Sequence, residues 1–149
     1  MNGKLAPQAQ AYILILRWTL SLIFFVMAAP KLFDPSFGAN ADVYFAALRD
    51  DIIISPYATF FNKMVLPNVY IVASFVKYAE LAIAGAFFIA FPMRLAVLLA
   101  TFLHLNYICI ASFPSLLYLN ILMIVCEWVC LAVVESRGTP AVKLYASSL

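Results

Sequence analysis

The chain has 149 residues, of which 66% are hydrophobic and 11% are charged, and its mean hydropathy is +1.02. Soluble domains are about 45–50% apolar and about 25% charged, so this composition excludes a water-soluble domain. The net charge of +2 is small and scattered, which excludes a nucleic-acid-binding surface. One membrane domain fits the length, because four crossings of about 20 residues take roughly 80 residues.

Four apolar runs follow one another along the chain. A bilayer offers backbone amides no hydrogen-bond partner, so each run is expected to be helical. The predicted spans are 11–29, 70–91, 93–113 and 115–134, with Pro30 and Lys31 closing the first. Prolines and very short turns separate the last three, which predicts two antiparallel hairpins. We therefore expect an all-α integral membrane protein, a bundle of four transmembrane helices.

The segment between the first two spans, residues 31–68, is too long for a structureless loop. Within it, Asp42–Asp51 has its apolar side chains on one helical face. The pair Ser55-Pro56 is typical of the start of a second helix. We expect two short interfacial helices that lie at the membrane surface or cap the bundle.

Lysine and arginine residues near the span ends predict the orientation. If both termini are inside, the cytoplasmic side holds Lys4, Arg94, Arg137 and Lys143, and the outside holds Lys31, Arg49 and Lys63. This asymmetry favours cytoplasmic termini and places residues 31–68 outside. We expect a multi-pass protein of a prokaryotic cytoplasmic membrane.

Several polar and charged side chains fall within the predicted spans, where an unpaired charge is costly. They are Arg17, Lys77, Glu80, His104, Asn106, Asn120 and Glu127. A helix rises about 1.5 Å per residue, so counting from the span ends sorts these side chains by depth. Arg17 and Glu127 share one layer, Glu80 and His104 the middle layer, and Lys77, Asn106 and Asn120 the outer layer. All of them are expected to face the bundle interior, a polar cavity or a partner subunit.

Their positions predict particular partners. Equal depth predicts a structural ion pair between Arg17 and Glu127 that fixes helix register, and the i, i+3 spacing predicts a pair between Lys77 and Glu80. For the middle layer, one interpretation is mutual neutralisation. The other is function, because a carboxylate and an imidazole at mid-membrane are typical of a proton relay or a quinone headgroup site. His104 is the only histidine, which excludes a bis-histidine haem and disfavours ligation of haem or chlorophyll.

The cysteines exclude one class of membrane enzyme. Cys109, Cys126 and Cys130 all lie in predicted spans and form no C-x-x-C motif, which a membrane disulfide oxidoreductase needs. No metal-ligand spacing and no glycine-rich phosphate loop is present in the sequence, so no metal site is predicted.

Three stretches resemble the DoxX-like family. The first is R-W-x-x-S-L-I-F at 17–24 with the following A-A-P-K-L-F-D-P at 28–35, the second is Y-A-E-L-A-I-A-G at 78–85, and the third is R-L-A at 94–96. The family includes the DoxD membrane subunit of thiosulfate:quinone oxidoreductase. The resemblance implies a four-helix membrane fold and a long first extramembrane segment.

Two functions remain open from the sequence, and both require other membrane subunits as partners. In the first, the chain is a membrane subunit of an oxidoreductase that passes electrons to quinone, with the redox centre on another chain. Glu80 would then take a proton, His104 would bind a quinone oxygen, and Lys77 or Arg17 would balance charge. In the second, the chain is a non-catalytic accessory subunit that stabilises a larger respiratory, oxidative or photosynthetic membrane complex.

Overall fold

The computed structural model describes residues 7–110 and 114–136, and over these ranges the chain is helical and contains no strand. The long helices are α1 (Pro7–Phe33), α5 (Val69–Ile89), α6 (Met93–Ile110) and α7 (Pro114–Ser136). Each belongs to a segment long and apolar enough to cross a membrane, which confirms the four predicted spans as helices. Residues 111–113 at the end of the predicted third span lie outside the described residues, as do Lys4, Arg137 and Lys143.

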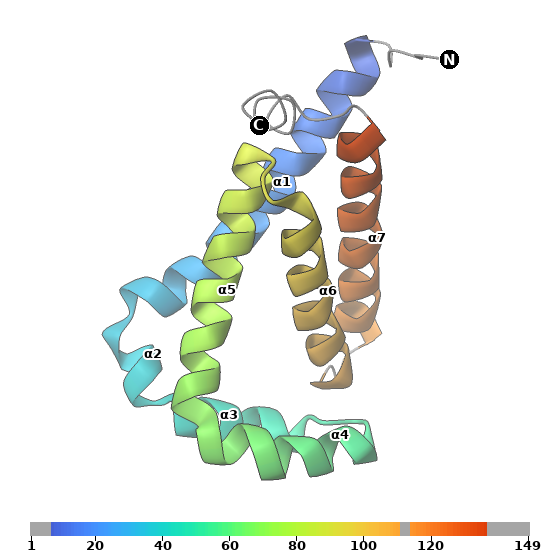
Figure 1. Ribbon diagram of the computed structural model, residues 1–149. Coiled ribbons are helices and arrows are strands. Elements are labelled where there is room, and N and C mark those ends of the chain that lie inside the picture. The colour runs from blue at the N-terminus through green and yellow to red at the C-terminus, as the bar shows by residue number, and fades with distance from the viewer. Residues whose placement is uncertain (1–6, 111–113, 137–149) are drawn as a thin grey trace, which may run out of the picture.

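The long helices pack around one core. Figure 1 shows α5, α6 and α7 running alongside one another, while α1 crosses α5 obliquely. The buried core between them includes Leu20, Phe24, Ile83, Phe87 and Val97. The rings of Phe24 and Phe87 stack at a centroid distance of 6.2 Å, which joins α1 to α5 at its centre.

Helix α1 is longer than the predicted first span. It continues through Pro30 to Phe33, although Pro30 was expected to close the helix. A proline removes one backbone donor, and a helix packed among others tolerates this loss. The amide of Asp34 donates to the carbonyl of Pro30 at 3.0 Å, so the hydrogen-bond ladder resumes after the proline. Lys31 therefore belongs to the last turn of α1 rather than to a loop.

Three short helices follow α1. They are α2 (Pro35–Ala39), α3 (Ala41–Asp50) and α4 (Ser55–Phe60). Asp34 begins α2, because its carboxylate accepts hydrogen bonds from the backbone amide of Ser36 at 2.8 Å and from the Ser36 hydroxyl at 2.6 Å. The amphipathic helix predicted over 42–51 is confirmed as α3, and α4 begins at the predicted Ser55-Pro56 pair.

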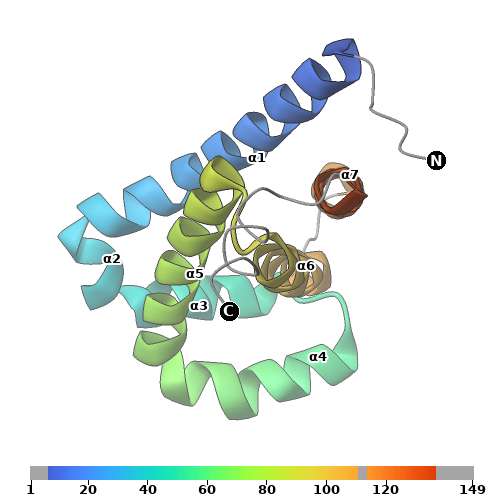
Figure 2. The ribbon, with the colours of Figure 1, turned by 45° about the horizontal axis from the view of Figure 1, so that its top comes forward.

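The sequence suggested that the second short helix is a separate element at the membrane surface. The structure shows instead that it is continuous with α5. A π-helical turn, Phe61–Val65, and a 3₁₀ turn, Leu66–Asn68, join α4 directly to α5. Pro67 has no backbone N–H to donate, and the changed hydrogen-bond pattern of these turns lets the helix continue past it. Helices α3 and α4 cross the base of the bundle in both views (Figures 1 and 2). A second small core holds them to α5 through Phe45, Phe61 and Val69.

Candidate functional site

Glu80 lies near the middle of α5 and is fully buried. The ammonium of Lys31, from α1, donates to both carboxylate oxygens at 2.7 and 2.6 Å. The hydroxyl of Tyr107, from α6, donates to Oε1 at 2.8 Å. Three helices therefore meet at one carboxylate, whose charge is compensated by a cation and whose oxygens accept three hydrogen bonds, as a buried charge requires.

Lys77 does not pair with Glu80, contrary to the i, i+3 prediction. Its ammonium lies 5.0 Å from the centroid of the Tyr78 ring, a cation–π contact. Within the described residues, no carboxylate forms an ion pair with it. The physical reason is that Lys31 approaches from α1 and occupies both oxygens of Glu80.

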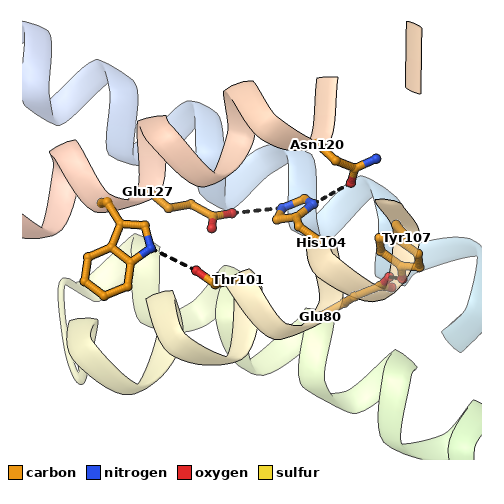
Figure 3. A network of polar contacts seen from close by, with 7 residues as sticks. Glu80, Thr101, His104, Tyr107, Asn120 and Glu127 are labelled. Carbon is orange, nitrogen blue, oxygen red and sulfur yellow. Dashed lines mark hydrogen bonds and ion pairs between the residues drawn. The ribbon is translucent and has the colours of Figure 1, made fainter. Parts of the chain in front are cut away.

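His104 joins α6 to α7 (Figure 3). Its Nε2 lies 2.9 Å from Oε1 of Glu127, and its Nδ1 lies 2.7 Å from Oδ1 of Asn120. The Asn120 amide donates through Nδ2 to the carbonyl of Leu116 at 2.7 Å, which turns its oxygen toward the imidazole. Because that oxygen is an acceptor, Nδ1 of His104 carries a hydrogen.

The contact between His104 and Glu127 holds one exchangeable proton. The proton belongs either to an imidazolium facing a carboxylate or to a carboxylic acid facing a neutral imidazole. The pair is neutral overall in both arrangements, and both side chains are buried. Within the described residues, the second oxygen of Glu127, Oε2, has no hydrogen-bond partner. The pair is therefore a group that can hold and pass on a proton inside the helix bundle.

The predicted ion pair between Arg17 and Glu127 is not formed. Arg17 Nη2 instead donates to the carbonyl of Phe88 at 3.2 Å, and Glu127 faces His104. The depth count treated the spans as parallel, whereas α1 crosses α5 obliquely (Figure 1), so equal counts do not give equal heights.

Asn106 lies apart from the other polar residues of its predicted layer. Its side-chain oxygen accepts a hydrogen bond from the hydroxyl of Tyr57 at 2.9 Å, and its nitrogen donates to the carbonyl of Phe102 at 2.7 Å. It therefore ties α6 to α4 rather than joining Asn120 beside His104.

The sequence did not indicate three of the partners of these polar side chains. They are Lys31 and Tyr107, which bind Glu80, and Tyr57, which binds Asn106. The position of Lys31 directly after Pro30 concealed it, because the proline was interpreted as the end of the helix. The tyrosines carried no signal, since aromatic side chains are frequent in membrane helices.

A cavity of about 550 Å³ lies between α1, α3, α6 and α7, beside the polar clusters of Glu80 and His104. Its polar lining consists of Lys31, Tyr44, Asp51, His104, Tyr107 and Asn120. Aliphatic and thioether side chains form the rest, among them Ile23, Met27, Leu116, Leu119 and Met123. Small-molecule sites measure about 300–1,000 Å³ and combine an apolar wall with a few polar groups. The cavity has the size and the lining of such a site.

The wall of this cavity connects the two carboxylates. The rings of His104 and Tyr107 meet edge-on at a centroid distance of 6.3 Å. Tyr107 binds Glu80, and His104 contacts Glu127. A molecule in the cavity would thus lie against both polar clusters at once.

Helix α3 closes one side of the cavity. Tyr44 and Leu48 line it and also border a second cavity of about 190 Å³, which lies between the short helices α3 and α4 and the long helices α5 and α6. Burial raises the pKa of Tyr44 above its ordinary value, and the negative charge of Glu80 adds to the rise. The Tyr44 phenol therefore stays protonated and is a hydrogen-bond donor at the cavity wall.

Comparison with protein-family models, curated proteins and solved structures gives no match. Among the described residues, no group of three or more histidine, cysteine, aspartate or glutamate side chains could hold a metal ion. The arrangement offers instead hydrogen-bond donors, an apolar wall and a buried exchangeable proton.

Proposed function

We propose that the chain is a DoxX-like integral membrane subunit of a quinone-linked oxidoreductase, and that its cavity binds a quinone headgroup. The observation that carries this proposal is the cavity of about 550 Å³, whose lining includes Lys31 and Tyr107, which bind Glu80, and His104, which contacts Glu127. The resemblance to DoxX-like proteins points in the same direction.

The donors suit a quinone because its two ring carbonyls accept hydrogen bonds. An ammonium has three N–H groups, and Lys31 uses two of them on Glu80, which leaves one for a ligand. The amide of Asn120 keeps one N–H beyond its bond to the Leu116 carbonyl. The aliphatic lining around Leu119 and Met123 suits the ring and its apolar tail.

The chemistry of reduction assigns different roles to the two carboxylates. A quinone takes up two electrons and two protons to become a quinol, and in this proposal the electrons come from a redox centre on a partner chain. The His104–Glu127 pair delivers one proton, takes up a second from water, and then delivers that one as well. The Lys31–Glu80 pair orients and polarises the quinone oxygen. In this proposal Glu127 therefore carries the proton, and not Glu80 as the sequence suggested.

A lipid environment accounts for the outer surfaces of the long helices. Large apolar side chains are exposed there, for example Leu22, Ile71, Leu98 and Leu122. In this proposal the four long helices cross a prokaryotic cytoplasmic membrane, both termini are cytoplasmic, and α2 and α3 lie toward the outside.

Binding of a short-chain quinone to the purified full chain tests the proposal. Leu119→Trp places an indole in the cavity and is expected to weaken binding about tenfold, which equals the loss of roughly 1.4 kcal/mol. Leu122→Trp is the matched control, because Leu122 is exposed on the same helix and does not line the cavity. It is expected to bind as the unchanged protein does.

Absence of saturable binding to the folded protein would contradict the quinone site. That result would favour the alternative raised by the sequence, a non-catalytic accessory subunit of a larger membrane complex. Equal binding by the Leu119→Trp and Leu122→Trp variants would show that quinone binds outside the cavity.

A further inference from the structure

Arg17 is a cation without an acidic partner among the described residues. Its hydrogen bond runs from Nη2 to the carbonyl of Phe88, at 3.2 Å. Its Nε is buried and has no partner within the same residues. A guanidinium has five N–H donors, so most of its capacity is unused, and a charge within an apolar helix needs a counter-charge.

The guanidinium lies at one end of the bundle. Phe88 is one residue before the last residue of α5, and an ion pair between Arg94 and Glu135 lies at the start of α6 and the end of α7. Figure 1 shows these helix ends at the same end of the bundle, with α1 continuing beyond them. If the long helices span a membrane, Arg17 therefore reaches the level of the lipid headgroups.

An apolar groove of about 590 Å³ lies between α1 and α5, and Phe88, whose carbonyl accepts the hydrogen bond from Arg17, is one of its lining residues. Its lining includes Trp18, Leu22, Phe25, Leu81, Gly85 and Phe88. The stretch from Trp18 to Phe25 covers roughly 10 Å of helix at about 1.5 Å per residue. A Cβ added to Gly85 would meet nothing within 4 Å, so the floor of the groove is open at this residue.

We propose that an anionic phospholipid occupies this groove, with its phosphate paired with Arg17 and one acyl chain lying along α1 and α5. The charge of Arg17 complements a phosphate, and guanidinium pairs well with phosphate oxygens. Trp18 stacks on Phe88 at a centroid distance of 6.3 Å, and indole rings favour the headgroup boundary. Arg94 already has a carboxylate partner, which leaves Arg17 as the unpaired cation among the described residues at this end of the bundle.

Quenching of Trp18 by brominated lipid tests this site, which rests on the proposed membrane placement and is independent of the quinone site. The full chain with Trp128→Phe keeps Trp18 as its only tryptophan. It is placed in phosphatidylcholine nanodiscs that contain an equal fraction of dibrominated phosphatidylglycerol or dibrominated phosphatidylcholine. We expect an apparent affinity about fivefold higher for the anionic lipid, which is the effect of one arginine near a membrane surface.

Matched variants separate the headgroup from the groove. Arg17→Gln is expected to abolish the preference for the anionic lipid, whereas Arg94→Gln keeps it. Gly85→Leu adds a side chain whose Cβ meets nothing within 4 Å and is expected to lower quenching by both lipids, whereas Gly38→Leu, at another open glycine, leaves it unchanged. If Arg17→Gln does not fold, the comparison of Gly85→Leu with Gly38→Leu decides.

Equal quenching by the two lipids, or a preference that survives Arg17→Gln, would overturn the proposal. So would a Trp18 that neither lipid quenches, which is the result expected if a helix of a partner chain fills the groove. Failure of the chain to enter nanodiscs would instead refute the membrane placement itself.

Discussion

Glu80 and Glu127 are both fully buried carboxylates on long helices, and they differ in their partners. Glu80 accepts two hydrogen bonds from Lys31 and one from Tyr107. Within the described residues, the hydrogen-bonding partner of Glu127 is His104, and its other oxygen has none. Burial alone therefore does not determine what a carboxylate does in this bundle.

The difference lies in the chemistry of the two cations. A lysine ammonium donates hydrogen bonds to both oxygens of Glu80 and balances the charge of this carboxylate. An imidazole gains or loses a proton readily, so Glu127 can share one with His104. We infer that Glu80 is a fixed charge that orients neighbouring groups, and that Glu127 is the carboxylate that carries a proton.

Lys31→Met is expected to have the largest effect, because it leaves the charge of Glu80 buried without a cation. Removing one partner of a buried pair costs about 3–5 kcal/mol of unfolding free energy. Unfolding of the purified chain in mixed micelles measures the loss. The double variant Lys31→Met/Glu80→Leu is expected to recover part of it, and a double variant no more stable than Lys31→Met would show that the pair is not the cause.

Glu127→Gln is expected to cost less, about 1 kcal/mol, because a glutamine amide still offers His104 a hydrogen-bond partner. The same unfolding measurement gives the comparison. Adding Arg17→Met is expected to bring no recovery, since Arg17 does not contact Glu127. A loss of unfolding free energy as large as that of Lys31→Met would mean that Glu127 is a permanent charge like Glu80 and does not share a proton with His104.

Asp34→Asn gives the smallest effect and serves as an exposed reference for the two buried carboxylates. Hydrogen bonds from the hydroxyl and the backbone amide of Ser36 hold the pKa of Asp34 below its ordinary value of 3.8. The stabilisation is fully present above that value and is lost as the pH falls through the lowered pKa. The difference in Tm between the two proteins is therefore expected to be constant near neutral pH and to shrink in acid. A difference in Tm that grows in acid would contradict the stabilisation of α2 by the Asp34 carboxylate.

The sequence was sufficient for the four long helices because a continuous apolar run is a local property of the chain. It also identified Glu80 and His104, since an ionisable side chain inside such a run requires a polar environment. The amphipathic pattern of residues 42–51 likewise predicted α3. Each of these inferences depends on residues close together in the sequence.

The partners of the buried charges could not be predicted in the same way. They depend on the rotation of each helix about its axis and on its tilt, and neither is encoded locally. The oblique path of α1 brings Lys31 to Glu80 and separates Arg17 from Glu127. Continuation of α1 through Pro30 was the particular step that the proline rule missed.

The central claim is that the cavity binds a quinone headgroup beside His104. His104 is the only histidine, so ¹⁵N-histidine labelling of the full chain gives one pair of ring-nitrogen NMR signals. Addition of a short-chain quinone is expected to shift these signals at the same concentration in the unchanged protein and in Leu122→Trp, and at about tenfold higher concentration in Leu119→Trp. Signals that stay unmoved at saturating quinone, or that shift at the same quinone concentration in both variants, would contradict the account.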